Sequence, residues 1–198
     1  LLCVLHDFKT EYPAIRIKIH NHSTPETIKH LISGKLDFAV ITTPFELSGQ
    51  LTYKKLISFQ EILVCGSQYR ELGYGRRKLE ELKEYPWVGI GTGTATTELY
   101  KEFFYRQNVN IEPDTEVATS DLLVPMIRAN MGIGFVPEKM AQPWLETRQL
   151  VRILLECEPP EREVRLVYDS GRGRSAASEG LQKYLGNLPA FEPFSNAD

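Results

Sequence analysis

Cysteine is scarce in this chain of 198 residues, and its three cysteines stand far apart. Cys3, Cys65 and Cys157 form no C-x-x-C pair and have no histidine at a ligand-like spacing. An odd number of distant cysteines argues against a disulfide framework and against a structural zinc site. We therefore expect the chain to work in a reducing compartment, the cytoplasm.

The chain also lacks a long apolar run and a strong excess of one charge. No stretch approaches the ~20 apolar residues of a membrane-spanning helix, and the start shows no signal-peptide pattern, so no membrane partner is expected. The 23 basic and 26 acidic residues give a formal net charge of -3, whereas a surface that holds nucleic acid is normally strongly basic. Because the sequence opens with Leu1-Leu2 rather than Met, we expect it to be a fragment of a longer protein.

Catalytic signatures are missing as well. The sequence has no nucleophile elbow, no H-E-x-x-H and no visible Ser/His/Asp order, so we do not expect an enzyme. Gly91-Thr92-Gly93 begins like a dinucleotide fingerprint, but Thr96 stands where that fingerprint has Gly or Ala. His20 and His22 would share one face of a strand, but the sequence nominates no further ligands. We therefore expect neither a cofactor nor a metal, and interpret the two histidines as solvated residues at a strand end.

Helical and strand-like patterns alternate over the first forty residues. Apolar residues in 1–8 recur at helical spacing, and Ile15, Ile17 and Ile19 then alternate with polar residues as in a half-buried strand. A helix is expected from the N-cap Thr24 to Gly34, and a buried strand at 36–41. This order with short connections is typical of a parallel sheet covered by helices.

Further elements form a second group along the chain. Strands are expected at 51–56, 61–65, 87–90, 116–118, 132–137 and 162–168, and helices at 79–83, 98–107, 121–130 and 175–185. With 42% hydrophobic residues, the chain can bury a full core in one large domain or two small lobes. The simplest arrangement has two α/β lobes, residues 1–63 with 166–198 and residues 64–165, connected by two crossing strands.

Hydroxyl-rich segments follow several of the predicted strands. They are Asn21 to Thr24, Thr42-Thr43, Thr92 to Thr97 and Thr119-Ser120. In open α/β sheets, ligands bind beyond the carboxyl ends of strands, where helix N-termini offer unpaired N–H groups. Hydroxyl groups add donors without a fixed charge, which suits a small carboxylate or similar anion. Because Ser and Thr are also favoured in caps and turns, capping is the alternative for each residue. The density of Gly and Thr in 91–97 favours ligand contact there.

Five segments share their order and approximate spacing with one known family. They are Phe8 through Tyr12-Pro13, Gly34-x-Leu36-Asp37-Phe38-Ala39-Val40, Glu61-Ile62-Leu63-Val64, Met126 through Gly132-Ile133-Gly134-Phe135-Val136-Pro137, and Arg174-Ser175-Ala176-Ala177. Together they resemble the effector-binding domain of LysR-type transcriptional regulators over nearly the whole chain.

The resemblance implies a fold, a ligand and partners. The fold is the type 2 periplasmic-binding-protein fold, two Rossmann-like lobes joined by two crossover strands, with a small, anionic effector in the cleft between the lobes. The resemblance also implies an upstream winged helix-turn-helix that contacts DNA, and a strand before the first helix, which this sequence does not contain. The apolar stripes of 1–8 and 99–104 are expected mainly to pack in the core. The resemblance also implies that helices of this kind line a side-by-side, antiparallel homodimer, and that the full-length protein forms a tetramer.

Effector contacts follow from the hydroxyl-rich segments together with the resemblance. The residues expected to contact the effector are Ser23, Thr24, Thr42, Thr43, Gly91, Thr92, Gly93, Thr94, Thr96, Thr97, Thr119 and Phe135.

Two other functions are compatible with such a fold. A solute-binding protein of a transporter would need a signal peptide or lipid anchor upstream. An enzyme would need a convergent acid/base pair, which the sequence does not suggest. Arg172-Gly173-Arg174 is basic, but three residues in a turn before a helix are better explained as a solvated loop than as a nucleic-acid contact.

Overall fold

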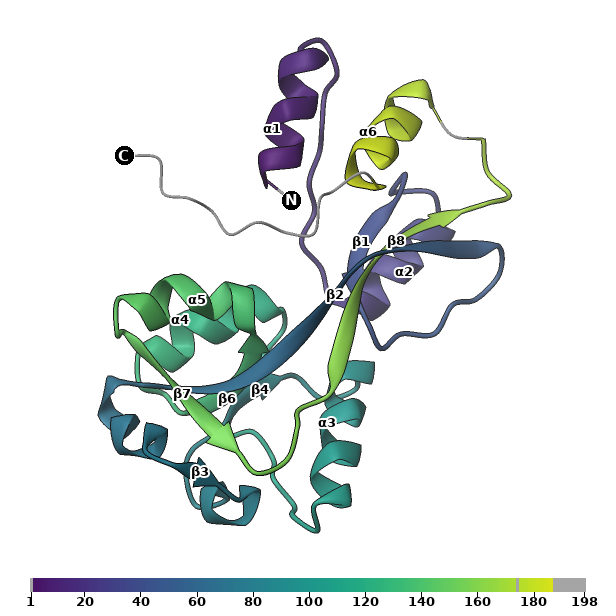
Figure 1. Cartoon of the computed structure of the whole chain (residues 1–198). Helices are drawn as coiled ribbons and strands as arrows, with labels where there is room; N and C mark the ends of the chain where they lie inside the picture. The colour runs from purple at the N-terminus through teal and green to yellow at the C-terminus, as the bar shows by residue number, and fades with distance from the viewer. Residues whose placement is uncertain (1, 174, 187–198) are drawn as a thin grey trace. The chain divides into compact units, whose positions relative to one another are not determined.

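The computed structural model describes residues 2–173 and 175–186 of two compact units (Figure 1). Unit 1 comprises Leu1–Ser58 and Glu163–Asp198, and unit 2 comprises Phe59–Arg162. The chain passes from one unit to the other within strand β2 (Leu51–Gly66) and returns within strand β8 (Glu161–Asp169). Both crossings lie a few residues before the predicted boundaries at 63/64 and 165/166, because each lies inside a continuous strand and no turn residue marks it.

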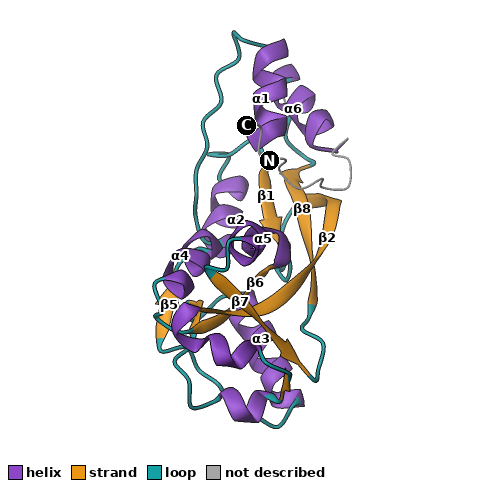
Figure 2. Cartoon of the chain, turned by 60° about the vertical axis from the view of Figure 1, so that its left-hand side comes forward, coloured by secondary structure: helices purple, strands orange, loops and turns teal. Residues whose placement is uncertain are grey.

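In the part of the chain that the structure describes, unit 1 combines three helices with a strand pair. Its elements are α1 (Leu2–Glu11), α2 (Thr24–Ile32), α6 (Ala176–Gly186), β1 (Ala39–Thr42) and parts of β2 and β8. β1 pairs antiparallel with β8, with Val40 opposite Leu166. Helices α1 and α6 lie side by side (Figures 1 and 2), and the ring of Phe8 meets that of Tyr184 edge-on at 5.3 Å. Phe8 is buried together with Leu166 and residues of α6, so these two helices cover one cluster.

The alternating segment that contains Ile15 is not a strand, contrary to the prediction. Ile15 and Ile17 are half-buried and pack against the Phe8 cluster, whereas Ile19 is 68% exposed. The alternation therefore indicated the buried face correctly at Ile15 and Ile17, but not at Ile19. A strand also needs a neighbour that takes up its backbone hydrogen bonds. β1, the next strand along the chain, pairs with β8 instead.

Helix α2 ends at Ile32 with Ser33 as its C-cap, and the predicted terminator Gly34 follows directly; a distant arginine contacts this end of the helix. Gly34 has a φ of +73°, a conformation that glycine adopts at little cost. Arg172 donates from Nη2 to the carbonyl oxygen of Ile32 at 3.2 Å. Its guanidinium occupies the space that a Cβ atom at position 34 would need. Arg172 is thus an exposed turn residue, as predicted, that also caps α2, while Arg174 lies outside the described residues.

Unit 2 contains most of the strands. Its strands are β3 (Arg76–Arg77), β4 (Val88–Ile90), β5 (Thr115–Val117), β6 (Ile133–Pro137) and β7 (Leu150–Leu155). Its helices are α3 (Ala95–Arg106), α4 (Leu123–Arg128) and α5 (Glu138–Glu146), with short 3-10 helices η1 (Ser67–Gly73), η2 (Leu79–Leu82) and η3 (Ser120–Leu122). Of the helices in the described part of the chain, none has both the length and the apolar character that crossing a bilayer requires.

Strand pairing is mixed, which corrects the expectation of a parallel sheet. β3 pairs parallel with β7, and β4 pairs parallel with β5. β2 is antiparallel to both β6 and β7, and β1 is antiparallel to β8. The segments expected at 51–56 and 61–65 form the single strand β2, because nothing in the intervening residues forces a turn.

The sheet formed by β2, β6 and β7 is buried on both faces. Leu63 and Cys65 belong to one cluster with Trp87, whereas Ile62 and Val64 belong to the other with Ile127. Successive residues of a strand point to opposite faces. Burial on both faces therefore explains why 61–65 is nearly continuously apolar rather than alternating.

Helix α5 and strand β7 were not predicted from the sequence. α5 contains Pro143 in its interior, and a proline normally ends or kinks a helix. Its Ala141 is fully buried, and Trp144 packs against the same cluster. Packing of this face therefore outweighs the helix-breaking tendency of a single residue.

We expect Gly34→Ala to destabilise the fold more than Gly49→Ala. Both glycines have positive φ, at +73° and +67°, but nothing lies within 4 Å of a Cβ at position 49. Backbone strain of about 1–2 kcal/mol applies to both variants, and displacement of the Arg172 guanidinium adds to it only at position 34. Urea unfolding followed by circular dichroism measures the difference, and equal losses would show that the Arg172 cap does not matter.

Thiol reactivity should follow burial. Burial raises the pKa of the Cys65 thiol to about 12, and the charge of Glu71 adds to this effect. At pH 8, the Cys65 side chain is then the reactive thiolate in only on the order of one molecule in ten thousand. We expect Ellman's reagent to label the exposed Cys3 first and Cys65 only after unfolding. A Cys3→Ser control should lose the fast phase, and rapid labelling of all three native thiols would contradict the assignment.

Candidate functional site

The loop from Gly91 to Thr97 connects β4 to α3 and is held by its own hydroxyl groups. Thr94 is the N-cap of α3, and its Oγ1 accepts a hydrogen bond from the backbone N–H of Thr97 at 3.2 Å. The buried Thr97 hydroxyl lies 2.7 Å from the carbonyl oxygen of Gly91. Two of the nominated threonines thus shape the loop, as the capping interpretation proposed.

The other side of this loop rests on β5. The backbone N–H of Gly91 donates to the carbonyl oxygen of Val117 at 2.9 Å, and that of Thr92 donates to Glu116 Oε2 at 3.2 Å. Thr92 and Gly93 are exposed. An anion at this side would have to compete with the Glu116 carboxylate for the Thr92 N–H, so the β5 side of the loop is unfavourable for negative charge.

Thr96, in the first turn of α3, faces a buried arginine. Arg162 donates from Nη2 to Thr96 Oγ1 at 3.0 Å, and its Nη1 lies 2.5 Å from Glu61 Oε1. The Arg162 side chain is 7% exposed and that of Glu61 is 2% exposed. The Arg162 guanidinium also lies 5.7 Å from the centre of the Phe59 ring. A positive charge is therefore fixed beside the N-terminal turn of a helix, where the backbone potential is also positive.

The Glu61 carboxylate neutralises the Arg162 charge, but its burial removes the water that would solvate it. Burial raises the pKa of the Glu61 carboxyl, and the neighbouring Arg162 charge opposes the increase. A buried ion pair is stable only when both partners are present and hydrogen-bonded. From the sequence, Glu61 and Arg162 were predicted only to be the first residues of strands. The one feature that could have drawn attention to them is a charged residue at the start of a strand pattern.

Thr119 belongs to the same sheet edge as the Gly91–Thr97 loop. It follows β5 and occupies the N-cap position of η3, where its half-buried side chain makes no capping hydrogen bond. Because β4 and β5 are parallel, the residues that follow them emerge at the same edge.

Phe135 lies elsewhere. It is 6% exposed and stacks on Tyr100 at 5.0 Å within the aromatic core, so we do not include it in the candidate site.

The nominated residues of unit 1 form a second group. Ser23 rather than Thr24 is the N-cap of α2, and its side chain makes no capping hydrogen bond. Thr42 ends β1, and the Thr43 hydroxyl accepts the backbone N–H of Glu163 at 2.9 Å. Thr43 therefore fixes the start of the unit 1 part of β8. In unit 1 the nominated residues therefore stand at the start of α2 and at the end of β1.

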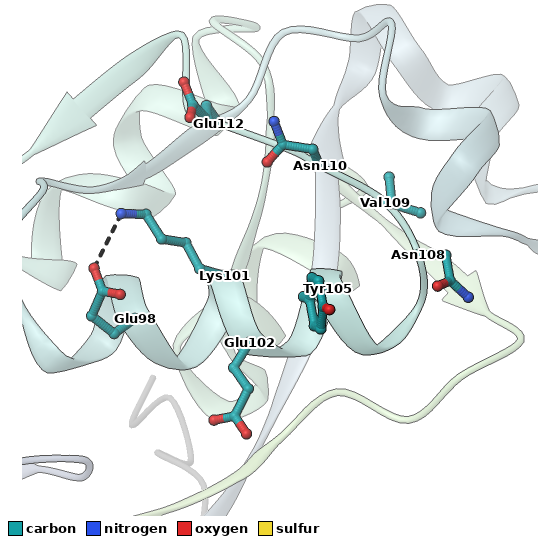
Figure 3. A pocket seen from close by; sticks show the side chains of 8 residues that line it. All are labelled: Glu98, Lys101, Glu102, Tyr105, Asn108, Val109, Asn110 and Glu112. Carbon is teal, nitrogen blue, oxygen red and sulfur yellow. Dashed lines mark hydrogen bonds and ion pairs between the residues drawn. The ribbon is translucent and has the colours of Figure 1, made fainter.

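A hollow beside α3 does not fit the predicted ligand. Figure 3 shows its lining by α3 and the segment that follows, and it includes Glu98, Glu102 and Glu112 with Lys101. Lys101 is paired with Glu98 at 3.1 Å. Three carboxylates with one already paired cation make this hollow unfavourable for an anion, and it contains none of the nominated residues.

Comparison with known sequences assigns the chain to a regulator family. The model of the LysR substrate binding domain matches residues 1–188. The HTH-type transcriptional regulator YofA of Bacillus velezensis is 22% identical over 183 residues, which cover 92% of this chain and 61% of the relative. The RuBisCO operon transcriptional regulator of Allochromatium vinosum is 19% identical over 178 residues, covering 90% and 59%. The chain spans about three fifths of the length of these curated relatives.

Solved structures confirm the fold expected from the sequence. The effector binding domain of QuiR, in complex with shikimate, superposes with a TM-score of 0.77 at 15% identity, covering 93% of this chain and 87% of the other. The regulatory domain of Synechocystis CcmR, in complex with 2-PG, gives a TM-score of 0.78 at 18% identity, covering 96% and 92%. Both neighbours have the two-lobed, periplasmic-binding-protein-like α/β fold.

The buried ion pair provides a test of how unit 2 is stabilised. Arg162→Met should cost about 3–5 kcal/mol, because it leaves the Glu61 carboxylate buried without a partner. Adding Glu61→Gln should recover much of this loss. Lys101→Met, which breaks the exposed pair with Glu98, should cost less than about 1 kcal/mol. Guanidinium unfolding of the variants measures the coupling, and simple additivity in the double variant would refute it.

Proposed function

This chain belongs to the LysR substrate-binding domain family, and on that premise we propose that its ligand is a small anion held at the N-terminus of α3. The observation that carries the proposal is the contact of 3.0 Å between the buried Arg162 and Thr96. Arg162 is already paired with Glu61, so its part is to position Thr96: the Thr96 oxygen accepts from Arg162, and the Thr96 O–H is a donor for the anion.

The local chemistry favours a compact, oxygen-rich ligand. The first turn of α3 provides backbone N–H groups, and Thr96 and Thr119 are half-buried hydroxyl residues. Shikimate, which the QuiR domain binds, is itself a carboxylic acid with several hydroxyl groups. A related class of ligand would satisfy the same donors in this chain.

Unit 1 contributes a second set of predicted contacts. Ser23 and Thr24 stand at the start of α2, and Thr42 and Thr43 at the end of β1. Helix α2 has Pro25 in its first turn, and a helix N-terminus favours anions through its backbone dipole. We propose that these residues also contact the effector.

Sensing requires that the ligand distinguish two states of the protein. A ligand that binds both conformations equally shifts neither. We propose that effector binding favours one arrangement of the domain, and that the change reaches DNA through a winged helix-turn-helix in another part of the regulator. The relative YofA is longer than this chain and is named an HTH-type transcriptional regulator, which supports that division of roles.

We further propose that the chain works as a homodimer, within a tetramer of the full-length regulator in the cytoplasm. Family membership supports the cytoplasmic location, because a regulator of transcription must reach DNA. The same membership disfavours the alternative of a transporter's solute-binding protein, and the family consists of transcriptional regulators rather than enzymes.

A thermal-shift screen tests the proposed ligand class. The panel contains shikimate, 2-PG, simple organic acids, amino acids, inorganic phosphate and sulfate, with neutral polyols such as glycerol for comparison. A ligand at 100 times its Kd should add about 2.7 kcal/mol of stability, or roughly 2–4 °C in Tm for a chain of this size. A shift confined to neutral compounds would contradict the anion assignment.

Thr96→Val should weaken binding of any hit, because it removes the hydroxyl beside Arg162 while keeping the side-chain volume. The loss of one hydrogen bond to a charged ligand is expected to cost about 1.5–3 kcal/mol, which is roughly a 10- to 150-fold increase in Kd. Thr147→Val, at the C-terminal end of α5, is the matched control and should bind normally. Isothermal titration calorimetry measures both, and equal affinity of the two variants would refute the role of Thr96.

A further inference from the structure

Three of the four histidines of the chain gather at helix α2. His20 and His22 stack with their ring centres 5.7 Å apart, and His22 meets His30 edge-on at 4.8 Å. The sequence showed His20 and His22 as neighbours, but it could not bring His30 to them. The fold does so by turning the chain back along α2 after residue 22.

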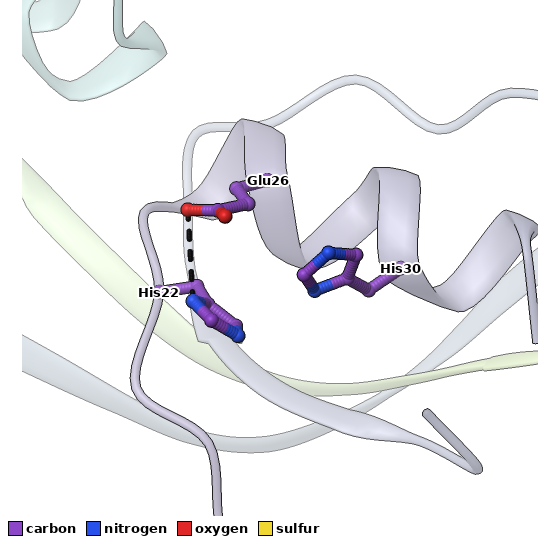
Figure 4. A group of neighbouring side chains, drawn as sticks. All are labelled: His22, Glu26 and His30. Atoms are coloured by element: carbon purple, nitrogen blue, oxygen red, sulfur yellow. Dashed lines mark ion pairs between the residues drawn. The ribbon is translucent and has the colours of Figure 1, made fainter. Parts of the chain in front are cut away.

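A carboxylate completes this group. Glu26 Oε2 lies 3.6 Å from His22 Nδ1, and one ligand atom from each of His22, Glu26 and His30 lies within 4.8 Å of the others. Glu26 and His30 are four residues apart on α2, so they occupy the same face of the helix. Figure 4 shows His22 beside this face, with its ring close to both side chains.

The chemistry of the three donors points to a metal ion. Two imidazoles and one carboxylate form a donor set that binds zinc and other divalent transition metals, with the remaining positions taken by water. We propose that His22, Glu26 and His30 form a binding site for a divalent transition-metal ion, for which Zn²⁺ is the reference. The site is separate from the anion contacts at α3 and does not depend on them.

The geometry is open but close to what an ion requires. Two ligand atoms on one tetrahedral zinc ion are about 3.4 Å apart, given bonds of 2.0–2.2 Å, so the present separations of up to 4.8 Å must shorten. The side chains of His22 and Glu26 are 26% and 52% exposed. Their rotation can therefore close the gap without disturbing the core, and the ion has a path from solvent.

An ion at this position would have a structural effect. His22 belongs to the extended segment 15–23, which is not paired into a strand, whereas Glu26 and His30 belong to α2. A bound ion would cross-link the segment to the helix. Ser23 and Thr24 lie between the ligands in sequence, so the same ion would fix their backbone.

Calorimetric titration with ZnCl₂ at pH 7.5 tests the site. Cys3→Ser and Cys157→Ser are introduced first, so that accessible thiols cannot bind the ion. We expect one ion per chain. His22→Ala and His30→Ala should each weaken binding at least about tenfold, since even the loss of an outer-shell partner has an effect of this size. His6→Ala, which removes the remaining histidine from the exposed face of α1, is the matched control and should bind normally.

Cobalt provides an independent measurement on the same variants. Co²⁺ held by the three residues should give visible d–d absorption, which His30→Ala and Glu26→Gln abolish or strongly reduce while circular dichroism remains unchanged. The proposal is overturned if zinc does not bind, if His22→Ala and His30→Ala bind it as well as the parent, or if His6→Ala loses as much affinity as they do.

Discussion

The buried ion pair between Glu61 and Arg162 is the interaction on which the architecture of unit 2 most depends. Unit 2 extends from Phe59 to Arg162, so the pair joins the strand by which the chain enters the unit to the strand by which it leaves. Two charges that are both less than 10% exposed tolerate neither the loss nor the displacement of a partner. Through its second amino group, Arg162 also holds Thr96. The same guanidinium thus closes the unit and positions the start of α3.

The rest of unit 2 gives this pair a rigid surrounding. β2, β6 and β7 form a sheet with apolar clusters on both faces, and the β4–β5 pair presents the Gly91–Thr97 loop at one edge. Within the loop, Thr94 and Thr97 satisfy the N-terminal turn of α3. The hydroxyl group of Thr96 is directed instead to Arg162. The division of roles among neighbouring threonines explains how a cap and the proposed effector contacts can share seven residues.

In unit 1, several side chains from different segments contact one helix, α2. Arg172 closes the C-terminal end of α2, Ser23 begins it, and His22 meets Glu26 and His30 along its side. The extended segment before α2 buries Ile15 and Ile17 without joining a sheet. Its attachment to the unit therefore depends on side-chain contacts rather than on the backbone hydrogen bonds of a sheet. The histidine cluster lies at the end of this segment, next to α2.

The two-lobed α/β class and the positions of most elements followed from the sequence by itself, because hydrophobic periodicity and turn residues act locally, and the family followed from the resemblance of five segments to LysR effector-binding domains. It also located the hydroxyl-rich loops, since strand ends and helix starts are local features. Only the tertiary structure decided which of those hydroxyls shape a loop and which face a charge, as Thr97 and Thr96 show. It alone joined Glu61 to Arg162 across 101 residues, placed His30 beside His22 and left Ile15 outside the sheet. Such contacts depend on the packing of segments distant in the chain, and no local pattern records which distant partner a side chain will meet.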